Sequence, residues 1–187
     1  MIGTFIHIPK AAGKTLKHSL NPYFIRRVGR HHTAASVFEH HPELRNNPTV
    51  VSVRNPWERI WSLYKYTKDI HIHNIGWDTW LYSPILNGSV YRHYDDIECD
   101  RNPLSLKTWV TDLDGNELVT DYIMFSDLSG GVSTMAEKYN IDVELETRTH
   151  FTDGKGVGYT KHYTDTQRDY VADVCAWEID KFNFKCQ

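Results

Sequence analysis

The feature that most constrains the fold of this chain is a short apolar strand that leads directly into a turn and a helix, an arrangement that occurs twice. We expect the first unit to have a strand over residues 4–8 and a helix over 14–20, and the second a strand over 49–53 and a helix over 56–67. The second strand is a β-branched run, which is typical of a buried parallel strand. These units predict an α/β fold with a central, mainly parallel sheet flanked by helices.

The turn in the first unit has the composition of an anion-binding loop. A helix that begins after such a turn offers unpaired backbone N–H groups and the positive end of its dipole. Lys10 and Lys14 add full positive charges at the same place, so phosphate or sulfate is the expected ligand. The residues that we expect to share this anion are Lys10, Ala11, Ala12, Gly13, Lys14 and Thr15.

Gly13, Lys14 and Thr15 also end the Walker A pattern of nucleoside triphosphatases. That pattern requires a glycine at position 8, where this chain has Ile8 in the strand. The chain also has an additional lysine, Lys10, at a position that the Walker loop leaves variable. The match to Walker A is therefore partial.

The second unit carries the signals of a helix start. Asn55 is a favourable N-cap, Pro56 suits the first helical position, and Glu58 has the spacing of a capping box. Apolar residues then recur at helical spacing on the side that we expect to pack on the sheet, and these are Trp57, Ile60, Trp61 and Tyr64.

Two polar residues of this unit point to a second anion contact. Arg54 follows the strand, and Ser62 lies two turns along the helix, away from the apolar stripe. A guanidinium can bind phosphate through two hydrogen bonds, and a hydroxyl can donate one more. A triphosphatase would more naturally place an aspartate at this strand end to hold Mg²⁺. Two other interpretations stay open, namely a carboxylate partner or a neighbouring helix end for Arg54, and simple exposure for Ser62.

Together the two loops resemble those of the sulfotransferases that use 3′-phosphoadenosine 5′-phosphosulfate (PAPS). Residues 9–15, with the pattern Pro-Lys-x-x-Gly-x-Thr, resemble the family's 5′-phosphosulfate loop, and Arg54 and Ser62 stand at the spacing of its 3′-phosphate pair. The resemblance implies a P-loop-like three-layer α/β fold. It also implies PAPS as cofactor and 3′-phosphoadenosine 5′-phosphate as product.

Further segments resemble one branch of that family. The His-x-Thr-Ala segment that starts at His31 is similar to one in the carbohydrate sulfotransferases, which include heparan uronyl 2-O-sulfotransferase and the chondroitin enzymes. Residues 109–128 and 159–184 resemble the segments around the late helices of that branch. The resemblance implies transfer of the sulfuryl group to a hydroxyl of a saccharide acceptor.

In-line sulfuryl transfer needs a general base and a positive group near the transferred sulfur. Lys10 is our candidate for neutralising charge on the sulfuryl group. The resemblance implies His31 as the base, since neutral imidazole is available near pH 7. His32 takes this role if the His-x-Thr-Ala frame is read one residue later. The acceptor's identity is not predicted.

Two alternative functions accompany this interpretation. The chain could be a small-molecule kinase or other P-loop enzyme that uses ATP and Mg²⁺ with Gly13, Lys14 and Thr15, or a catalytically silent module that binds a nucleotide or a sulfated ligand. Lys155, in a glycine-rich segment, is either a contact to the nucleotide or part of a surface turn. The histidines at 40–41 and at 71 and 73 lack a third ligand at a diagnostic spacing, so no metal is predicted.

Composition bounds these possibilities. The 187 residues suit one domain over 1–187, and a net charge of −3 gives no reason to expect nucleic acid as a partner. An anion site must then be made by local lysines and arginines.

Without a long apolar run, and with a strand beginning near Met1, we predict a soluble cytoplasmic protein that has no membrane span, unlike the Golgi members of the family. Its oligomeric state is not predicted. Reduced thiols are expected for Cys99, Cys175 and Cys186.

The rest of the chain supplies further elements. We expect short elements and loops over 71–103, and a hairpin whose strands, 109–113 and 117–120, flank an Asp-Gly-Asn turn. A strand over 122–125 precedes a helix that starts after a Ser-Gly-Gly segment. A final helix follows residues 164–167, which have capping-box form.

Overall fold

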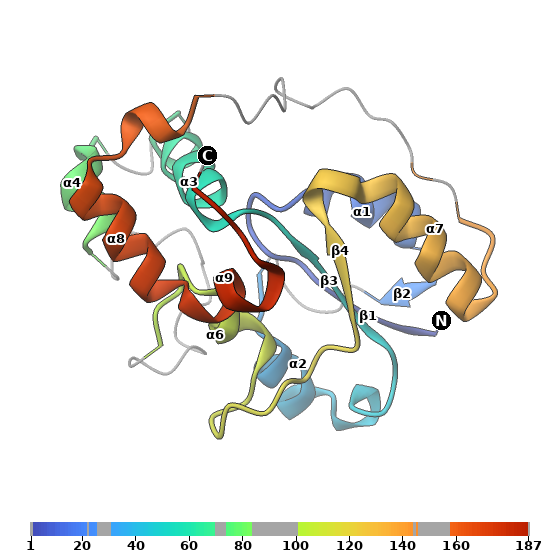
Figure 1. Cartoon of the computed structure of the whole chain (residues 1–187). Helices are drawn as coiled ribbons and strands as arrows, with labels where there is room; N and C mark the ends of the chain where they lie inside the picture. The colour runs from blue at the N-terminus through green and yellow to red at the C-terminus, as the bar shows by residue number, and fades with distance from the viewer. Residues whose placement is uncertain are drawn as a thin grey trace.

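The computed structural model describes residues 2–21, 23–25, 31–69, 74–83, 101–143, 145 and 158–186. Its sheet has the strand order β2-β1-β3-β4, and every neighbouring pair is parallel (Figure 1). The strands are β1 (Gly3–Ile6), β2 (Phe24–Ile25), β3 (Thr49–Val53) and β4 (Asp121–Met124).

Helices cover both faces of this sheet. One face packs against α1 (Gly13–Leu20) and α7 (Leu128–Tyr139), which lie side by side in Figure 1. The other helices that the structure describes share the hydrophobic core on the other face. These are α2 (Ala34–His40), α3 (Pro56–Asp69), α4 (Trp77–Leu81), α6 (Leu106–Val110), α8 (Asp165–Val174) and α9 (Ala176–Phe182). Short 3-10 turns lie at Pro42–Leu44, Phe125–Asp127 and Thr160–His162.

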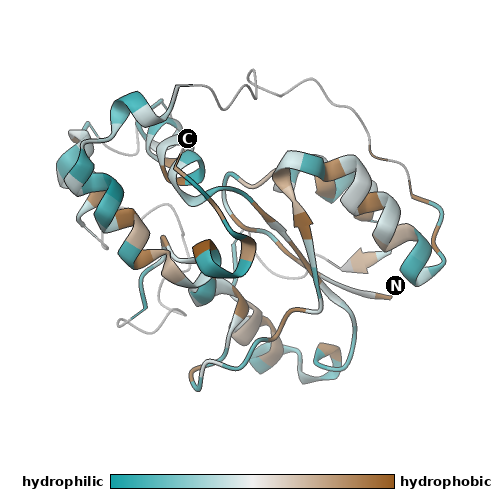
Figure 2. Ribbon diagram, viewed as in Figure 1, coloured by the Kyte–Doolittle hydropathy of each residue, from teal (hydrophilic) through white to brown (hydrophobic). Residues whose placement is uncertain are grey.

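Alternation along the strands creates the two cores. Phe5 and Ile123 join the core beneath α1 and α7, whereas Ile6, Val51 and Val53 belong to the core on the opposite face. Figure 2 shows hydrophobic residues along the strands. Hydrophobic and hydrophilic residues alternate along α7 and α8, as expected of helices with one buried side. The predicted α/β fold with a parallel sheet flanked by helices is thereby confirmed.

The strand order creates a switch point between β1 and β3. From β1 the chain continues to β2 on one side, and from β3 it continues to β4 on the other. The connections after β1 and β3 therefore diverge from the carboxyl edge of the sheet. In open α/β sheets, ligands bind in the crevice outside such a point. Both anion-binding segments predicted from the sequence begin there.

The elements of the two strand–helix units agree closely with the prediction. β3 covers 49–53 as expected, β1 ends two residues before the predicted end, and α3 continues to Asp69. The Asn55 side chain accepts a hydrogen bond from the Trp57 backbone N–H at 3.2 Å, as an N-cap does. The capping box predicted for Glu58 is wrong, because this carboxylate accepts a hydrogen bond from Arg54 instead.

The predicted hairpin is mostly wrong. Trp109 and Val110 end helix α6, and only one antiparallel bridge, between Thr111 and Glu117, joins the two expected strands. Burial of Leu106, Trp109 and Val110 at helical spacing overrides the β propensity of this segment. The expected turn is present, with Gly115 at φ 84.

Differences also occur in the late helices. α7 starts at Leu128, before the glycine pair, because the Asp127 side chain accepts a hydrogen bond from the Gly130 N–H and so caps the helix. The capping box of α8 is confirmed. The single final helix that we expected breaks at Cys175, where α8 ends and α9 begins.

Some predicted features lie outside the described residues. These are Cys99, His71, His73 and Lys155, together with most of residues 71–103. Both described cysteines, Cys175 and Cys186, are free thiols. Within the part of the chain that the structure describes, no helix is long and apolar enough to cross a bilayer.

Candidate functional site

The loop between β1 and α1 has an unusual backbone. Lys10 and Ala12 both have φ of 64°, and Ala11 between them does not have a positive φ. The left-handed region costs a non-glycine residue about 1–2 kcal/mol, so the surrounding structure must hold this conformation. Successive backbone N–H groups in turns that include left-handed residues can form anion-binding nests.

β3 supplies the contacts that hold the loop. Ser52, which is fully buried, donates its hydroxyl hydrogen bond to the carbonyl of Ala11. Arg54 donates from Nη1 to the carbonyl of Lys10 at 2.9 Å. Because the two sides of a trans peptide point in opposite directions, the Ala12 N–H points away from Ser52. The loop thus turns two carbonyls toward β3 and one amide away from it.

The start of α1 continues this donor-rich surface. The first N–H that bonds back to the loop carbonyl of Ala12 is that of Leu16, at 3.1 Å, which leaves the preceding amides without a partner within the helix. Lys14 is exposed, and the side chains of Lys14 and Thr15 make no hydrogen bond or ion pair with a described residue. The predicted cradle residues are therefore gathered around one donor-rich turn.

Lys10 lies in a positively charged environment. Burial lowers the pKa of Lys10, and the neighbouring charges of Arg54 and Lys14 lower it further. Its Nζ atom lies 4.5 Å from the centroid of the Tyr66 ring. A bound anion would reverse the electrostatic part of this shift. Lys65 on α3 is a further cation near Lys10, which the sequence did not single out.

Arg54 is held by contacts on several sides. In addition to the Lys10 carbonyl, its guanidinium contacts the Glu58 carboxylate, with Nη2 and Oε1 2.7 Å apart, and stacks over the Phe125 ring at 4.1 Å. The carboxylate partner that was one interpretation of Arg54 is therefore present. A phosphate bound by Arg54 has to share the guanidinium with Glu58.

Ser62 faces the same side of α3 as the groups that contact the loop. Residues 58, 62 and 66 follow one another at intervals of four, which places them on one face of the helix. Glu58 contacts Arg54, and Tyr66 contacts Lys10. Ser62 therefore lies between these two contacts and is half-buried, and its hydroxyl makes no hydrogen bond with a described residue.

His31 approaches the first loop from the segment between β2 and α2. Its Nδ1 lies 3.1 Å from the backbone carbonyl of His7, and the two imidazole centroids are 4.5 Å apart. The next residues lead into α2, where Thr33 accepts the capping hydrogen bond from the Ser36 N–H. The structure thus brings His31 to the loop. His32 is adjacent, and its Nε2 atom is buried. Sequence reasoning missed His7, for which only proximity to the loop was available as a signal.

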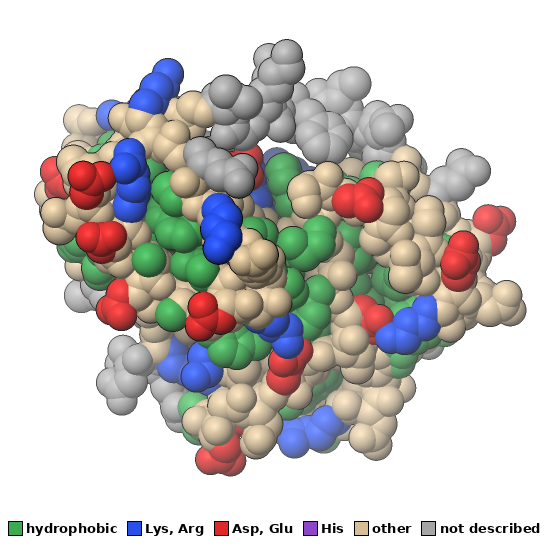
Figure 3. All heavy atoms as spheres, viewed as in Figure 1, with side chains coloured by type: hydrophobic (Ala, Val, Ile, Leu, Met, Phe, Trp, Pro, Cys, Tyr) green, Lys and Arg blue, Asp and Glu red, His purple; other side chains and the backbone are tan. Residues whose placement is uncertain are grey.

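On the face seen in Figure 3, the charged side chains that the structure describes do not form one large patch of a single sign. Figure 3 shows acidic and basic side chains interspersed over the visible face. This agrees with the small net charge of −3 and with the expectation that a local group of cations must form any anion site.

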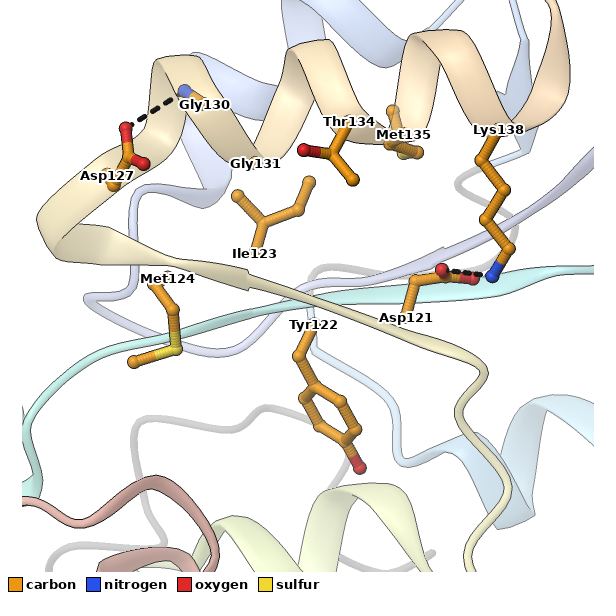
Figure 4. A pocket seen from close by; sticks show the side chains of 10 residues that line it. All are labelled: Asp121, Tyr122, Ile123, Met124, Asp127, Gly130, Gly131, Thr134, Met135 and Lys138. Carbon is orange, nitrogen blue, oxygen red and sulfur yellow. Dashed lines mark hydrogen bonds and ion pairs between the residues drawn. The ribbon is translucent and has the colours of Figure 1, made fainter.

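A cavity of about 300 Å³ lies elsewhere, between β4 and α7 (Figure 4). None of the predicted site residues lines it. Its charged side chains already have partners within the lining, since Asp121 contacts Lys138 and Asp127 caps α7 at Gly130. Gly131 permits the close approach of helix and strand, because a Cβ there would lie 2.8 Å from the Ile123 side chain. This cavity is therefore a packing feature of the sheet edge.

Comparison with known proteins identifies no similar protein. The chain matches no protein-family model, and its comparison with curated proteins and with solved structures gives no significant match. Among the described residues, no group of three or more His, Cys, Asp or Glu side chains is placed to hold a metal ion. The functional assignment therefore depends on the residues of the site itself.

Proposed function

We propose that this protein is a PAPS-dependent sulfotransferase that transfers a sulfuryl group to a hydroxyl of a saccharide. The observation that carries the proposal is that the loops after β1 and β3 meet at the switch point of the sheet, where Arg54 bonds to the carbonyl of Lys10. The two predicted anion-binding motifs, 44 residues apart in the sequence, are therefore parts of one site.

The cofactor would occupy this site through its two charged ends. The 5′-phosphosulfate would bind to the nest and the start of α1, with Lys10, Lys14 and Thr15 around it. The 3′-phosphate would bind to Arg54 and Ser62, which lie toward the same side of α3. The fold would then be of the P-loop-like kind. Burial is the largest cause of the lowered pKa of Lys10, and the neighbouring charges of Arg54 and Lys14, which lower it further, support this assignment.

The reaction forms a bond between the acceptor oxygen and sulfur, and breaks the bond between sulfur and the bridging phosphate oxygen. The electron pair of the broken bond leaves with 3′-phosphoadenosine 5′-phosphate, and Lys10 neutralises the charge that develops on the bridging oxygen. The acceptor proton passes to His31. A backbone carbonyl only accepts hydrogen bonds, so the contact with His7 places the proton of neutral His31 on Nδ1, and Nε2 is the nitrogen that would take up the acceptor proton.

The test is sulfate transfer from labelled PAPS to a panel of glycans. We expect turnover with at least one acceptor, and a loss of about 10²- to 10⁴-fold in kcat for His31→Ala with nucleotide binding preserved. His32→Ala is the matched control, and it should retain more activity because its Nε2 is buried. Nucleotide binding without turnover on any acceptor would instead identify a catalytically silent binding module.

A further inference from the structure

His7 occupies a position between the anion-binding loop and His31. It follows β1 directly, and its ring lies against the first residue of α1. A Cβ on Gly13 would lie 1.7 Å from Cδ2 and 2.0 Å from Nε2 of His7, so only glycine leaves room for the imidazole there. The His7 ring is therefore wedged against the start of the helix that the anion would approach.

Two different parts of His7 contact His31. The backbone carbonyl of His7 accepts a hydrogen bond from Nδ1 at 3.1 Å, and the His7 ring lies 4.5 Å from the His31 ring at an interplanar angle of 44°. A ring contact together with a directional hydrogen bond fixes both the position and the rotation of an imidazole. It also selects the tautomer, because the bonded nitrogen must carry the proton.

We propose that His7 is a positioning residue that holds His31 in the tautomer with its proton on Nδ1. Gly13 and the His7 ring form the support, and the His7 carbonyl selects the nitrogen. The catalytic consequence rests on the proposed sulfotransferase function, in which Nε2 of His31 accepts the proton of the acceptor. The tautomer itself does not depend on that function.

The direct test is long-range ¹H–¹⁵N NMR of the full chain labelled in its histidines, which distinguishes the two neutral tautomers by nitrogen chemical shift. Loss of signals in His31→Gln assigns this residue. We expect wild-type His31 to be Nδ1-protonated. His7→Ala keeps the backbone carbonyl but removes the ring contact that holds His31 against it, so this variant should show a mixture of tautomers. His7→Phe, which keeps a flat ring against Gly13, should restore the wild-type state. If His7→Ala does not fold, His7→Leu takes its place with the same expected mixture.

Two results would overturn the positioning role. One is an Nε2-protonated His31 in the wild type, and the other is an unchanged tautomer in folded His7→Ala or His7→Leu. In kinetic measurements we expect kcat to fall about tenfold in His7→Ala, KM for PAPS to change by no more than about twofold, and kcat to recover in His7→Phe. Equal changes of kcat in the Ala and Phe variants would contradict positioning by the ring. Absence of sulfate transfer in every variant would refute the proposed function, while the NMR result still decides the role of His7.

Discussion

Substitution of Glu58 by glutamine tests whether Arg54 binds a ligand or only stabilises the loop. Glu58 occupies one edge of the Arg54 guanidinium, with Oε1 2.7 Å from Nη2. Glutamine keeps an oxygen that can accept this hydrogen bond, but it removes the negative charge. If Arg54 binds the 3′-phosphate, the variant should bind 3′-phosphoadenosine 5′-phosphate more tightly, because the phosphate no longer competes with a carboxylate.

The size of the expected change in Kd follows from the burial of the Arg54–Glu58 ion pair. The Arg54 and Glu58 side chains are only 13% and 16% exposed. Opposite unit charges about 4 Å apart attract by about 4 kcal/mol at an effective dielectric constant of 20 and by about 1 kcal/mol in bulk water. Exposed pairs measure at most about 1 kcal/mol. For this largely buried pair, which lies between the two limits, we expect about 1.4 kcal/mol, which corresponds to a tenfold lower Kd.

Isothermal titration calorimetry of wild type and Glu58→Gln, at one fixed ionic strength, measures this difference. Glu117→Gln is the matched control, because it removes the charge of an ion pair with Lys181 near the opposite end of β4 and should leave Kd unchanged. Weaker or equal binding in a folded Glu58→Gln protein would refute the reasoning. Arg54 and Glu58 would then be a structural pair.

Three further predictions follow from contacts and pKa shifts. Gly13→Ala should lower the free energy of unfolding by about 1–3 kcal/mol and weaken nucleotide binding, because its Cβ would overlap the His7 ring. A higher stability of this variant in urea denaturation would contradict the prediction. Gly76→Ala is the control, because the space around Gly76 is open and the variant should leave nucleotide binding unchanged. Because the pKa of Lys10 is lowered in the free protein, nucleotide binding at about pH 9 should take up protons, as shown by calorimetry in buffers of different ionisation enthalpy, whereas Lys10→Arg should show no uptake. Burial raises the pKa of Glu178, so the folded state holds this proton more tightly than the unfolded state does, and the contribution of Glu178 to stability falls as the pH rises above about 4.5. The free energy of unfolding of Glu178→Gln should therefore exceed that of the wild type by a growing amount as the pH rises. A difference that stays constant with pH would contradict the shift.

Local sequence signals predicted much of the framework. The β-branched run of β3 defined a buried strand, and Asn55 marked the start of α3. Thr164 and Gln167 marked the start of α8 through a complete capping box. These features depend on residues close together in the chain, so a sequence pattern can report them.

Features that depend on distant residues could not be predicted. Helix α6 forms where β propensity favoured a strand, and its first N–H, that of Leu106, donates to the buried Glu178 carboxylate at 2.8 Å. That partner lies 72 residues away. No local sequence pattern predicts such a cap, because the two residues come into contact only when the helices pack together.

The same limit applies to the candidate site. Lys10 and Ala12 are not residue types that favour the left-handed region, and their conformation is held by Ser52 and Arg54 from another strand. The sequence assigned Glu58 to a capping box and left the carboxylate partner of Arg54 unnamed, whereas the structure pairs Glu58 with Arg54. The motifs therefore predicted which residues would gather, but not the contacts that orient them.

Calorimetry with three nucleotides tests the proposed function most directly. Wild-type protein and Arg54→Ala would be titrated with 3′-phosphoadenosine 5′-phosphate, with adenosine 5′-phosphate, and with ATP and Mg²⁺. We expect the wild type to prefer the 3′-phosphorylated nucleotide, and Arg54→Ala to lose about tenfold or more of that affinity while its affinity for adenosine 5′-phosphate changes little. Preference for ATP and Mg²⁺, or an undiminished affinity of Arg54→Ala for the 3′-phosphorylated nucleotide, would contradict the assignment of this site to PAPS.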